Sequence, residues 1–170
     1  MKAVILYDTK HGTTAGAAAG IAQGLGGEAR LLPLSDAAAA QALALADYDL
    51  VVVGGPIYFG QWSKAALSFL SARGAELGGG RLALFALGSL VSEGPEAVRA
   101  ALPALIAAGR PDIGWFGGRM EGLKLSLGER LIVKMVSKSP QPSRDFDPEA
   151  ARAFGAELGR RYSKETTCGK

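Results

Sequence analysis

The chain has 170 residues, a length typical of one domain with a sizeable core. Hydrophobic residues make up 48% of it and aromatic residues only 7%, so the core must be mainly aliphatic. A formal net charge of +3 is too small for a dedicated nucleic-acid-binding protein, and a single cysteine, Cys168, excludes an internal disulfide bond and fits a reducing cytosol.

Short runs of branched aliphatic residues alternate with Ala- and Leu-rich stretches along the whole chain. The first run, KAVILY, predicts a strand at 2–7, and a helix over 13–25 follows it and ends at Gly26. Ser63 and Asp147 are predicted to cap later helices, and Pro95 to begin one. Further strands are predicted at 29–34, 49–54, 81–87 and 112–118, and further helices at 37–46, 63–73, 95–108 and 148–163.

Five strands that alternate with helices predict a parallel sheet covered on both faces. The strands are nearly continuous apolar runs, as burial on both faces requires. No repeat or domain boundary interrupts residues 1–170, so we predict a single α/β domain with a doubly wound sheet. In such sheets ligands bind beyond the carboxyl ends of the strands, where the strand order reverses.

The turn between the first strand and the first helix, DTKHGTT at 8–14, has the composition of an anion site. Thr9, Thr13 and Thr14 offer hydroxyl groups, Gly12 allows tight curvature, and the helix N-terminus offers N–H groups. The turn lacks both G-x-x-x-x-G-K-[ST] and G-x-G-x-x-G, so a single phosphate monoester fits better than ATP or a dinucleotide. The alternative is that Thr13 merely caps the helix and Gly12 makes the turn.

Two further loops follow the third and fourth strands at the same edge of the sheet, GGPIYFGQW at 54–62 and LGSLVSEGP at 87–95. The first combines glycines, a proline and three aromatic residues, which suits a planar ring that needs backbone partners and a stacking surface. We expect Tyr58 or Trp62 to contact the ring, whereas Phe59 is more typical of a core residue. The alternative is that all three aromatic side chains fill the end of the core.

These loops resemble those of a known family. TKHGTT at 9–14 is similar to the phosphate loop of flavodoxins, and GGPIYFG at 54–60 is similar to their flavin-facing loop. The resemblance implies a flavodoxin-like fold, with a doubly wound five-stranded parallel sheet and helices on both faces, that binds flavin mononucleotide (FMN). It implies a phosphate held by Thr9, His11, Gly12, Thr13 and Thr14. It implies a ring lying against Pro56, Ile57, Tyr58, Gly60, Gly88, Ser89 and Leu90.

A basic insertion at 119–147 is too long for an ordinary connection between the fifth strand and the last helix. Its segment 119–138, RMEGLKLSLGERLIVKMVSK, holds five basic and two acidic residues, which accounts for the whole net charge. From 127 onward its apolar and basic residues follow helical spacing. Such a helix can lie on an anionic membrane surface, or pack on its own domain with the basic face in water. No run approaches the roughly 20 apolar residues that span a bilayer, so we expect a soluble protein or one that lies on a membrane surface.

The insertion is similar to one in menaquinone-dependent protoporphyrinogen dehydrogenases, flavodoxin-like enzymes that oxidise the haem precursor at the membrane and pass electrons to quinone. The resemblance implies an FMN-dependent oxidoreductase with a porphyrinogen substrate and a quinone or other redox partner, in the cytoplasm or on the inner face of the cell membrane. Basic side chains would pair with the substrate's propionates or an anionic surface, and leucines would meet apolar groups. These residues are Lys124, Leu127, Arg130, Leu131, Lys134 and Lys138.

Other functions fit the same sequence. GGPIYFG is closer to the loop of flavodoxin-like NAD(P)H:quinone reductases, and the third loop lacks an aromatic residue to cover the flavin. A soluble electron carrier, such a reductase and a flavodoxin fold without flavin are therefore the alternatives. No catalytic acid or base and no metal site are predicted, because a flavin would itself carry the redox chemistry.

Overall fold

The computed structural model describes residues 1–58, 60–77, 80–88, 94–102, 104, 109, 111–118 and 145–165. Strands and helices alternate along the chain, as predicted from the sequence. The strands are β1 (Lys2–Tyr7), β2 (Glu28–Pro33), β3 (Leu50–Tyr58), β4 (Gln61–Trp62), β5 (Leu82–Leu87) and β6 (Asp112–Trp115). The helices are α1 (Thr13–Leu25), α2 (Ala37–Ala42), α3 (Lys64–Arg73), α4 (Gly94–Ala101) and α7 (Pro148–Glu165), with 3₁₀ turns η1 (Leu45–Asp47) and η2 (Gly74–Leu77).

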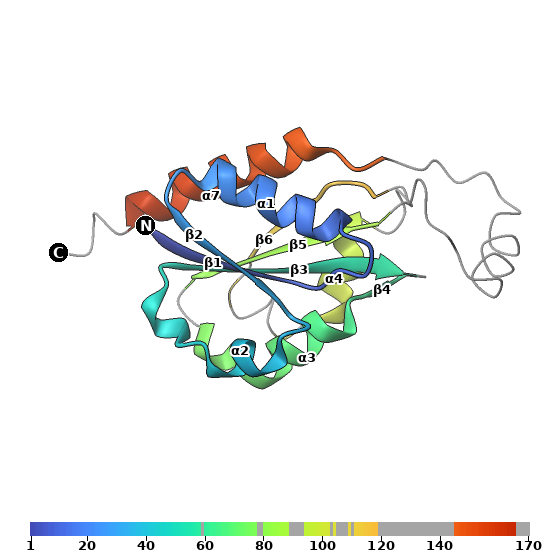
Figure 1. Cartoon of the computed structure of the whole chain (residues 1–170), viewed down its shortest axis with the longest axis horizontal. Coiled ribbons are helices and arrows are strands. Elements are labelled where there is room, and N and C mark those ends of the chain that lie inside the picture. The colour runs from blue at the N-terminus through green and yellow to red at the C-terminus, as the bar shows by residue number, and fades with distance from the viewer. Residues whose placement is uncertain are drawn as a thin grey trace, which may run out of the picture.

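The main sheet is parallel, with the order β2-β1-β3-β5-β6. From the central pair β1 and β3 the chain adds strands outward in both directions, so the order reverses between these two strands. Helices α1 and α7 cover one face of the sheet, and α2 and α3 cover the other (Figure 1). The predicted doubly wound α/β fold is confirmed, and β4, a short antiparallel addition to β3, is the strand that was not predicted.

The core has two halves because side chains alternate between the faces of each strand. Along β1, Val4 and Leu6 pack toward α2 and α3, while Ala3 and Ile5 pack toward α1 and α7. All four are fully buried. Burial on both faces explains why the strands are apolar throughout and lack an in-and-out alternation.

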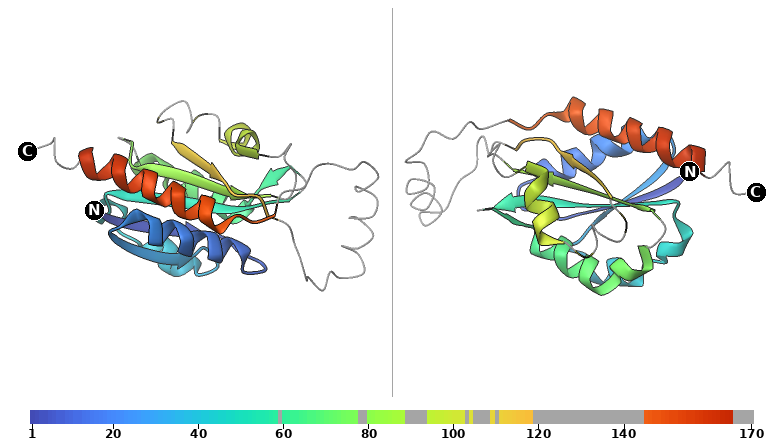
Figure 2. Two further views of the ribbon diagram at one scale, coloured as in Figure 1. Left: turned by 90° about the horizontal axis from the view of Figure 1, so that it is seen from above. Right: turned by 180° about the vertical axis from the view of Figure 1, so that it is seen from behind.

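Helices α1 and α7 lie side by side (Figure 2), and their backbones approach closely at glycine positions. A Cβ atom on Gly155 of α7 would overlap the carbonyl oxygen of Ile21 and lie 2.9 Å from its carbonyl carbon. A Cβ on Gly24 of α1 would in turn overlap the carbonyl oxygen of Arg152 and lie 2.8 Å from the amide nitrogen of Ala156. Glycine is therefore required at these positions to let the two backbones approach.

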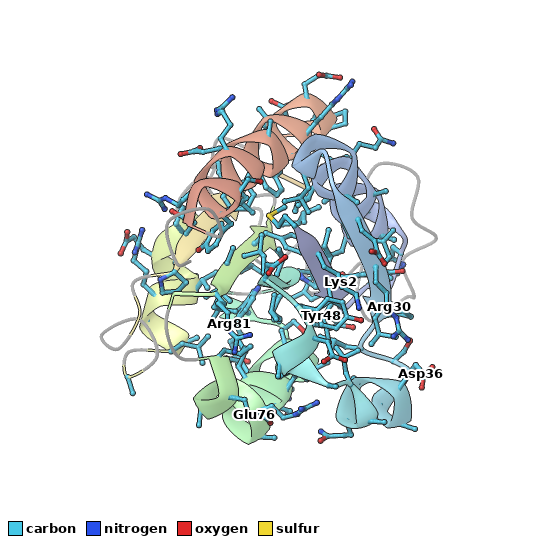
Figure 3. The ribbon with its side chains drawn as sticks, turned by 90° about the vertical axis from the view of Figure 1, so that its left-hand side faces the viewer. Lys2, Arg30, Asp36, Tyr48, Glu76 and Arg81 are labelled. Atoms are coloured by element: carbon cyan, nitrogen blue, oxygen red, sulfur yellow. The ribbon has the colours of Figure 1, made fainter. Side chains whose placement is uncertain are left out.

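Two arginines, Arg73 and Arg81, bind backbone carbonyls in the connections between the elements; Figure 3 shows Arg81 near Tyr48 and Glu76. Arg73 donates to the carbonyls of Ala40, Gln41 and Leu43 after α2, at 3.1, 3.1 and 2.8 Å, and forms an ion pair with Glu76. Arg81 donates to the carbonyls of Tyr48 and Glu76, both at 3.1 Å. These bonds satisfy carbonyls that no helix or strand pairs, and they hold the α2–β3 connection against α3.

The boundaries differ clearly from the prediction in four places. The helix predicted over 95–108, with Pro95 as its first residue, runs from Gly94 to Ala101. The helix predicted over 37–46 ends at Ala42, because the backbone becomes extended at Leu43 and Arg73 binds the carbonyls there. The strand predicted over 112–118 ends at Trp115, and Gly117 turns the chain at a φ of +70°. The third strand, predicted to end at 54, continues to Tyr58. The predicted N-caps are confirmed at Ser63 and Asp147, whose side chains accept from the N–H groups of Ala66 and Ala150.

Several predicted features lie outside the described residues. Among the described residues, no helix has both the length and the apolar character needed to cross a bilayer. The features outside are Phe59, Ser89, Leu90, most of the helix predicted beyond Ala101, Cys168 and insertion residues 119–144, with Lys124, Leu127, Arg130, Leu131, Lys134 and Lys138.

Candidate functional site

The loop between β1 and α1 is shaped around an open helix N-terminus. The Thr9 hydroxyl oxygen accepts from the N–H of Gly12 at 3.0 Å, which closes a tight turn. Gly12 has a φ of +90°, a left-handed conformation that favours glycine. It occupies the N-cap position, and no described side chain caps the helix. Thr13 is the first helical residue and not the cap, so the first-turn N–H groups are left for solvent or a ligand.

A pocket opens between this loop and the carboxyl ends of β3, β5 and β6. Eight of the twelve residues predicted to bind the cofactor line it: Thr9, His11, Thr13, Thr14, Pro56, Ile57, Tyr58 and Gly88. Gly12 is not among the lining residues and instead shapes the loop, and Gly60 lies in the β3–β4 turn away from the lining. Ser89 and Leu90 fall outside the described residues.

Three described lining residues were missed by the sequence reasoning. Lys10 lies within the predicted phosphate loop but has no glycine or hydroxyl signature. Leu87 is the last residue of β5 and Gly118 follows β6, and both can be found from the rule that ligands bind beyond the carboxyl ends of the strands. Gly118 reaches the pocket because the N–H of Gly88 donates to the carbonyl of Gly117 at 3.1 Å.

The β3–β4 hairpin separates the aromatic residues of the second loop. Ile57 pairs with Trp62 and Tyr58 with Gln61. Tyr58 is 38% exposed and lines the pocket, whereas Trp62 is 1% exposed and its indole N–H donates to the carbonyl of Gly55 at 3.2 Å. We expected a ring contact from Tyr58 or Trp62, and Tyr58 is the one that remains a candidate, since strand alternation turns the Trp62 side chain into the core.

The pocket has a cationic side and an apolar side. Lys10, His11 and the α1 N-terminus favour an anion, and none of the described lining residues is acidic. Thr14, 3% exposed, is a further hydroxyl-bearing lining residue of the loop. Pro56, Ile57 and Leu87, three uncharged lining residues from the ends of β3 and β5, make up the apolar wall. A phosphate joined to a flat, largely apolar ring fits both sides, and FMN is such a molecule.

A doubly wound sheet with an uncapped helix N-terminus after β1 and an apolar wall from β3 and β5 is typical of nucleotide- and flavin-binding α/β proteins. The family model described as a flavodoxin domain matches residues 4–147, which is most of the chain. The chain belongs to the flavodoxin domain family. FMN is the cofactor that this membership implies, in agreement with the pocket. No match was found among curated proteins.

Solved structures with the same fold cover nearly the whole chain. A flavodoxin from the domain Archaea is 14% identical, with a TM-score of 0.61 over 96% of this chain and 99% of that one. A WrbA-like flavodoxin from Agrobacterium tumefaciens is 19% identical, with a TM-score of 0.58 over 96% and 98%. A flavodiiron protein from Giardia intestinalis is 20% identical, with a TM-score of 0.59 over 98% of this chain but only 37% of its own length.

Proposed function

We propose that this protein is an FMN-dependent oxidoreductase that oxidises an acidic amphipathic substrate of the protoporphyrinogen type and passes the electrons to a quinone. Family membership supports the cofactor and the redox class. The observation that carries the choice of substrate is the position of the basic insertion. The described residues on both sides of it lie beside the cofactor pocket.

The structure describes the residues that flank the insertion on both sides. On the incoming side, Gly118 lines the pocket. On the outgoing side, the N–H of Asp147 donates to the carbonyl of Phe116 at 2.9 Å, and the Phe146 ring lies beside Gly16 in the first turns of α1. The described residues that flank 119–144 therefore include one pocket residue, Gly118, and a neighbour of the α1 helix that begins at the pocket, Phe146. The sequence between them contains Arg130, Lys134 and Lys138.

The residues of the pocket bind and orient the cofactor in this proposal. Thr9, Thr13 and Thr14 hydrogen-bond the phosphate, together with the first-turn N–H groups of α1. Pro56, Ile57 and Tyr58 lie against the ring, Gly60 keeps the β3–β4 turn tight, and Gly88 lines the pocket directly after β5. Bound FMN supplies the electron transfer. In each cycle two hydrogens leave the substrate and one quinone becomes its quinol.

A comparison of electron donors tests the reaction. The FMN-loaded protein is mixed anaerobically with protoporphyrinogen, NADPH, NADH or a flavodoxin reductase, and bleaching of the flavin absorbance is followed before and after a menaquinone analogue is added. We expect bleaching by protoporphyrinogen and recovery with the quinone. Bleaching by NAD(P)H alone would instead indicate an NAD(P)H:quinone reductase.

Cosedimentation with vesicles tests the role of the insertion. Each basic residue near an anionic surface contributes about 1 kcal/mol, so replacing Arg130, Lys134 and Lys138 by glutamine should weaken binding about hundredfold. A control variant replaces three exposed arginines elsewhere with the same change of charge: Arg30, Arg152 and Arg160. An equal loss of vesicle binding in both variants would show that net charge alone accounts for the effect. If the wild-type protein does not bind anionic vesicles, membrane association is no longer part of the proposal.

An electron carrier is the second candidate function. It is favoured by the exposure of Tyr58, which is 38% accessible at the edge of the pocket and so leaves this edge open to a protein partner. Reduction of the flavin by the reductase alone, with no turnover of protoporphyrinogen or quinone, would support the carrier against the enzyme.

A further inference from the structure

A hydrogen-bonded link lies behind the cofactor pocket. Thr14 and Ser63 are the two buried polar residues among those described. Thr14 lines the pocket, but Ser63, 6% exposed, does not. The Ser63 hydroxyl donates to the Asp8 carboxylate at 2.6 Å and accepts from the N–H of Ala66 at 3.2 Å. We call the bond between these side chains the Asp8–Ser63 link.

The link crosses from β1 to the start of α3 over the strand between them. Val4 and Leu6 face α2 and α3, so alternation along β1 places the Asp8 side chain on the same face. The Asp8 N–H donates to the carbonyl of Gly54 at 2.9 Å. A Cβ atom on Gly55 would overlap Ser63 and lie 3.6 Å from the Cβ of Asp8, so the link is packed tightly against β3.

The link is connected to both walls of the pocket, directly in sequence at Asp8 and through packing against Gly55 at Ser63. Asp8 precedes Thr9, whose hydroxyl closes the phosphate loop. Gly55, against which Ser63 packs, precedes Pro56 on the apolar wall. Asp8, Ser63 and Gly55 do not themselves line the pocket. The link therefore joins the two walls from behind, where it has no direct contact with a ligand in the pocket.

We propose that Asp8 is a positioning residue that holds the phosphate loop in register with the apolar wall and so determines the preference for FMN over riboflavin. The proposal rests on FMN binding at this pocket. A ligand that contacts both walls binds more tightly when their separation is fixed. Binding at one wall then raises the effective concentration of the other end of the ligand at the second wall. Riboflavin lacks the phosphate and uses one wall, so it gains little from the link.

The test measures dissociation constants for FMN and riboflavin by quenching of flavin fluorescence. The variants are Asp8→Ala, which removes the acceptor, and Asp8→Asn, whose amide oxygen still accepts from the Ser63 hydroxyl. Asp36→Ala is the matched control, because Asp36 caps α2 through the N–H of Ala39 at 3.1 Å and is absent from the pocket. Ser63→Ala removes the donor of the same bond and serves if Asp8→Ala does not fold.

We expect Asp8→Ala to weaken FMN binding about tenfold, the scale of one hydrogen bond to a charged group, and riboflavin binding less than threefold. Asp8→Asn should restore most of the FMN affinity, and Asp36→Ala should change neither ligand. An unchanged ratio of the two affinities in Asp8→Ala, or an Asp8→Asn variant as weak as Asp8→Ala, would overturn the positioning role alone. A wild-type protein that binds neither flavin would overturn the pocket assignment together with it.

Discussion

The glycine-lined contact between α1 and α7 predicts that two glycine-to-alanine substitutions differ in their effect on the free energy of unfolding. Gly155→Ala places a Cβ inside the carbonyl oxygen of Ile21, so the helices must move apart. Gly16→Ala, on the exposed part of α1, places its Cβ 3.7 Å from the Phe146 ring, which is an ordinary contact. Both changes replace glycine by alanine within a helix, and they differ in the space available.

The magnitudes follow from two opposing effects. Alanine stabilises a helix interior by about 1 kcal/mol relative to glycine. Overpacking costs up to about 3 kcal/mol, and the upper end applies here because the obstacle is backbone that no side-chain rotation can move. Gly155→Ala should therefore lower the free energy of unfolding by about 2 kcal/mol. Gly16→Ala should leave it unchanged or raise it by up to about 1 kcal/mol.

Urea unfolding of the apoprotein, followed by far-ultraviolet circular dichroism, measures both changes without a contribution from bound flavin. In a thermal melt, the Gly155→Ala variant should lose about 4–8 °C. A Gly155→Ala protein at least as stable as the wild type would refute the close backbone packing. Equal shifts in the two variants would show that helix propensity alone accounts for both.

Three further predictions concern the pocket and the surface. Thr14→Ala should weaken FMN binding by about 1–3 kcal/mol, the scale of a hydrogen bond to a charged phosphate, and leave riboflavin binding unchanged in a fluorescence titration. Tyr58→Ala should shift the visible absorption band of the bound flavin, because it removes an aromatic surface at the pocket edge; a spectrum identical to wild type would place Tyr58 away from the ring. The hydrogen bond from Arg73 holds the pKa of Glu76 below its ordinary value, so the stabilisation is present at neutral pH and is lost as the pH falls through that pKa. Glu76→Gln should therefore lower the melting temperature at pH 7, and the difference from wild type should vanish in acid.

Local signals in the sequence were sufficient to predict most of the elements. Continuous aliphatic runs such as LVVV and LALF mark strands buried on both faces, because few other elements of that length need every side chain to be apolar. Ser63 and Asp147 were predictable as caps, since their side chains accept from an N–H three residues later. The position of the loop beside a pocket was predictable because its glycine and threonines lie between a strand and a helix.

Features that depend on distant residues could not be predicted in this way. Gly55 and Pro56 read as turn residues, yet they pair with Ala86 and Leu87 of β5 and extend β3. Glycine is required at 54 because a Cβ there would overlap the Phe85 ring, a contact that no local pattern reveals. Trp62 could not be distinguished from Tyr58 as the pocket residue, because a two-residue strand is too short to show alternation.

The hydrogen bond between the N–H of Asp147 and the carbonyl of Phe116 also bears on how this protein could have diversified. It joins the described residues on the two sides of 119–144, so a change in the length of the connecting segment costs little additional loop-closure entropy. An insertion at this position can therefore change which partner the protein binds, while the flavin-binding domain stays the same. Replacing residues 119–144 with a short Gly-Ser linker between Gly118 and Asp145 would give a shortened protein. Flavin binding could then be measured separately from any binding that depends on residues 119–144.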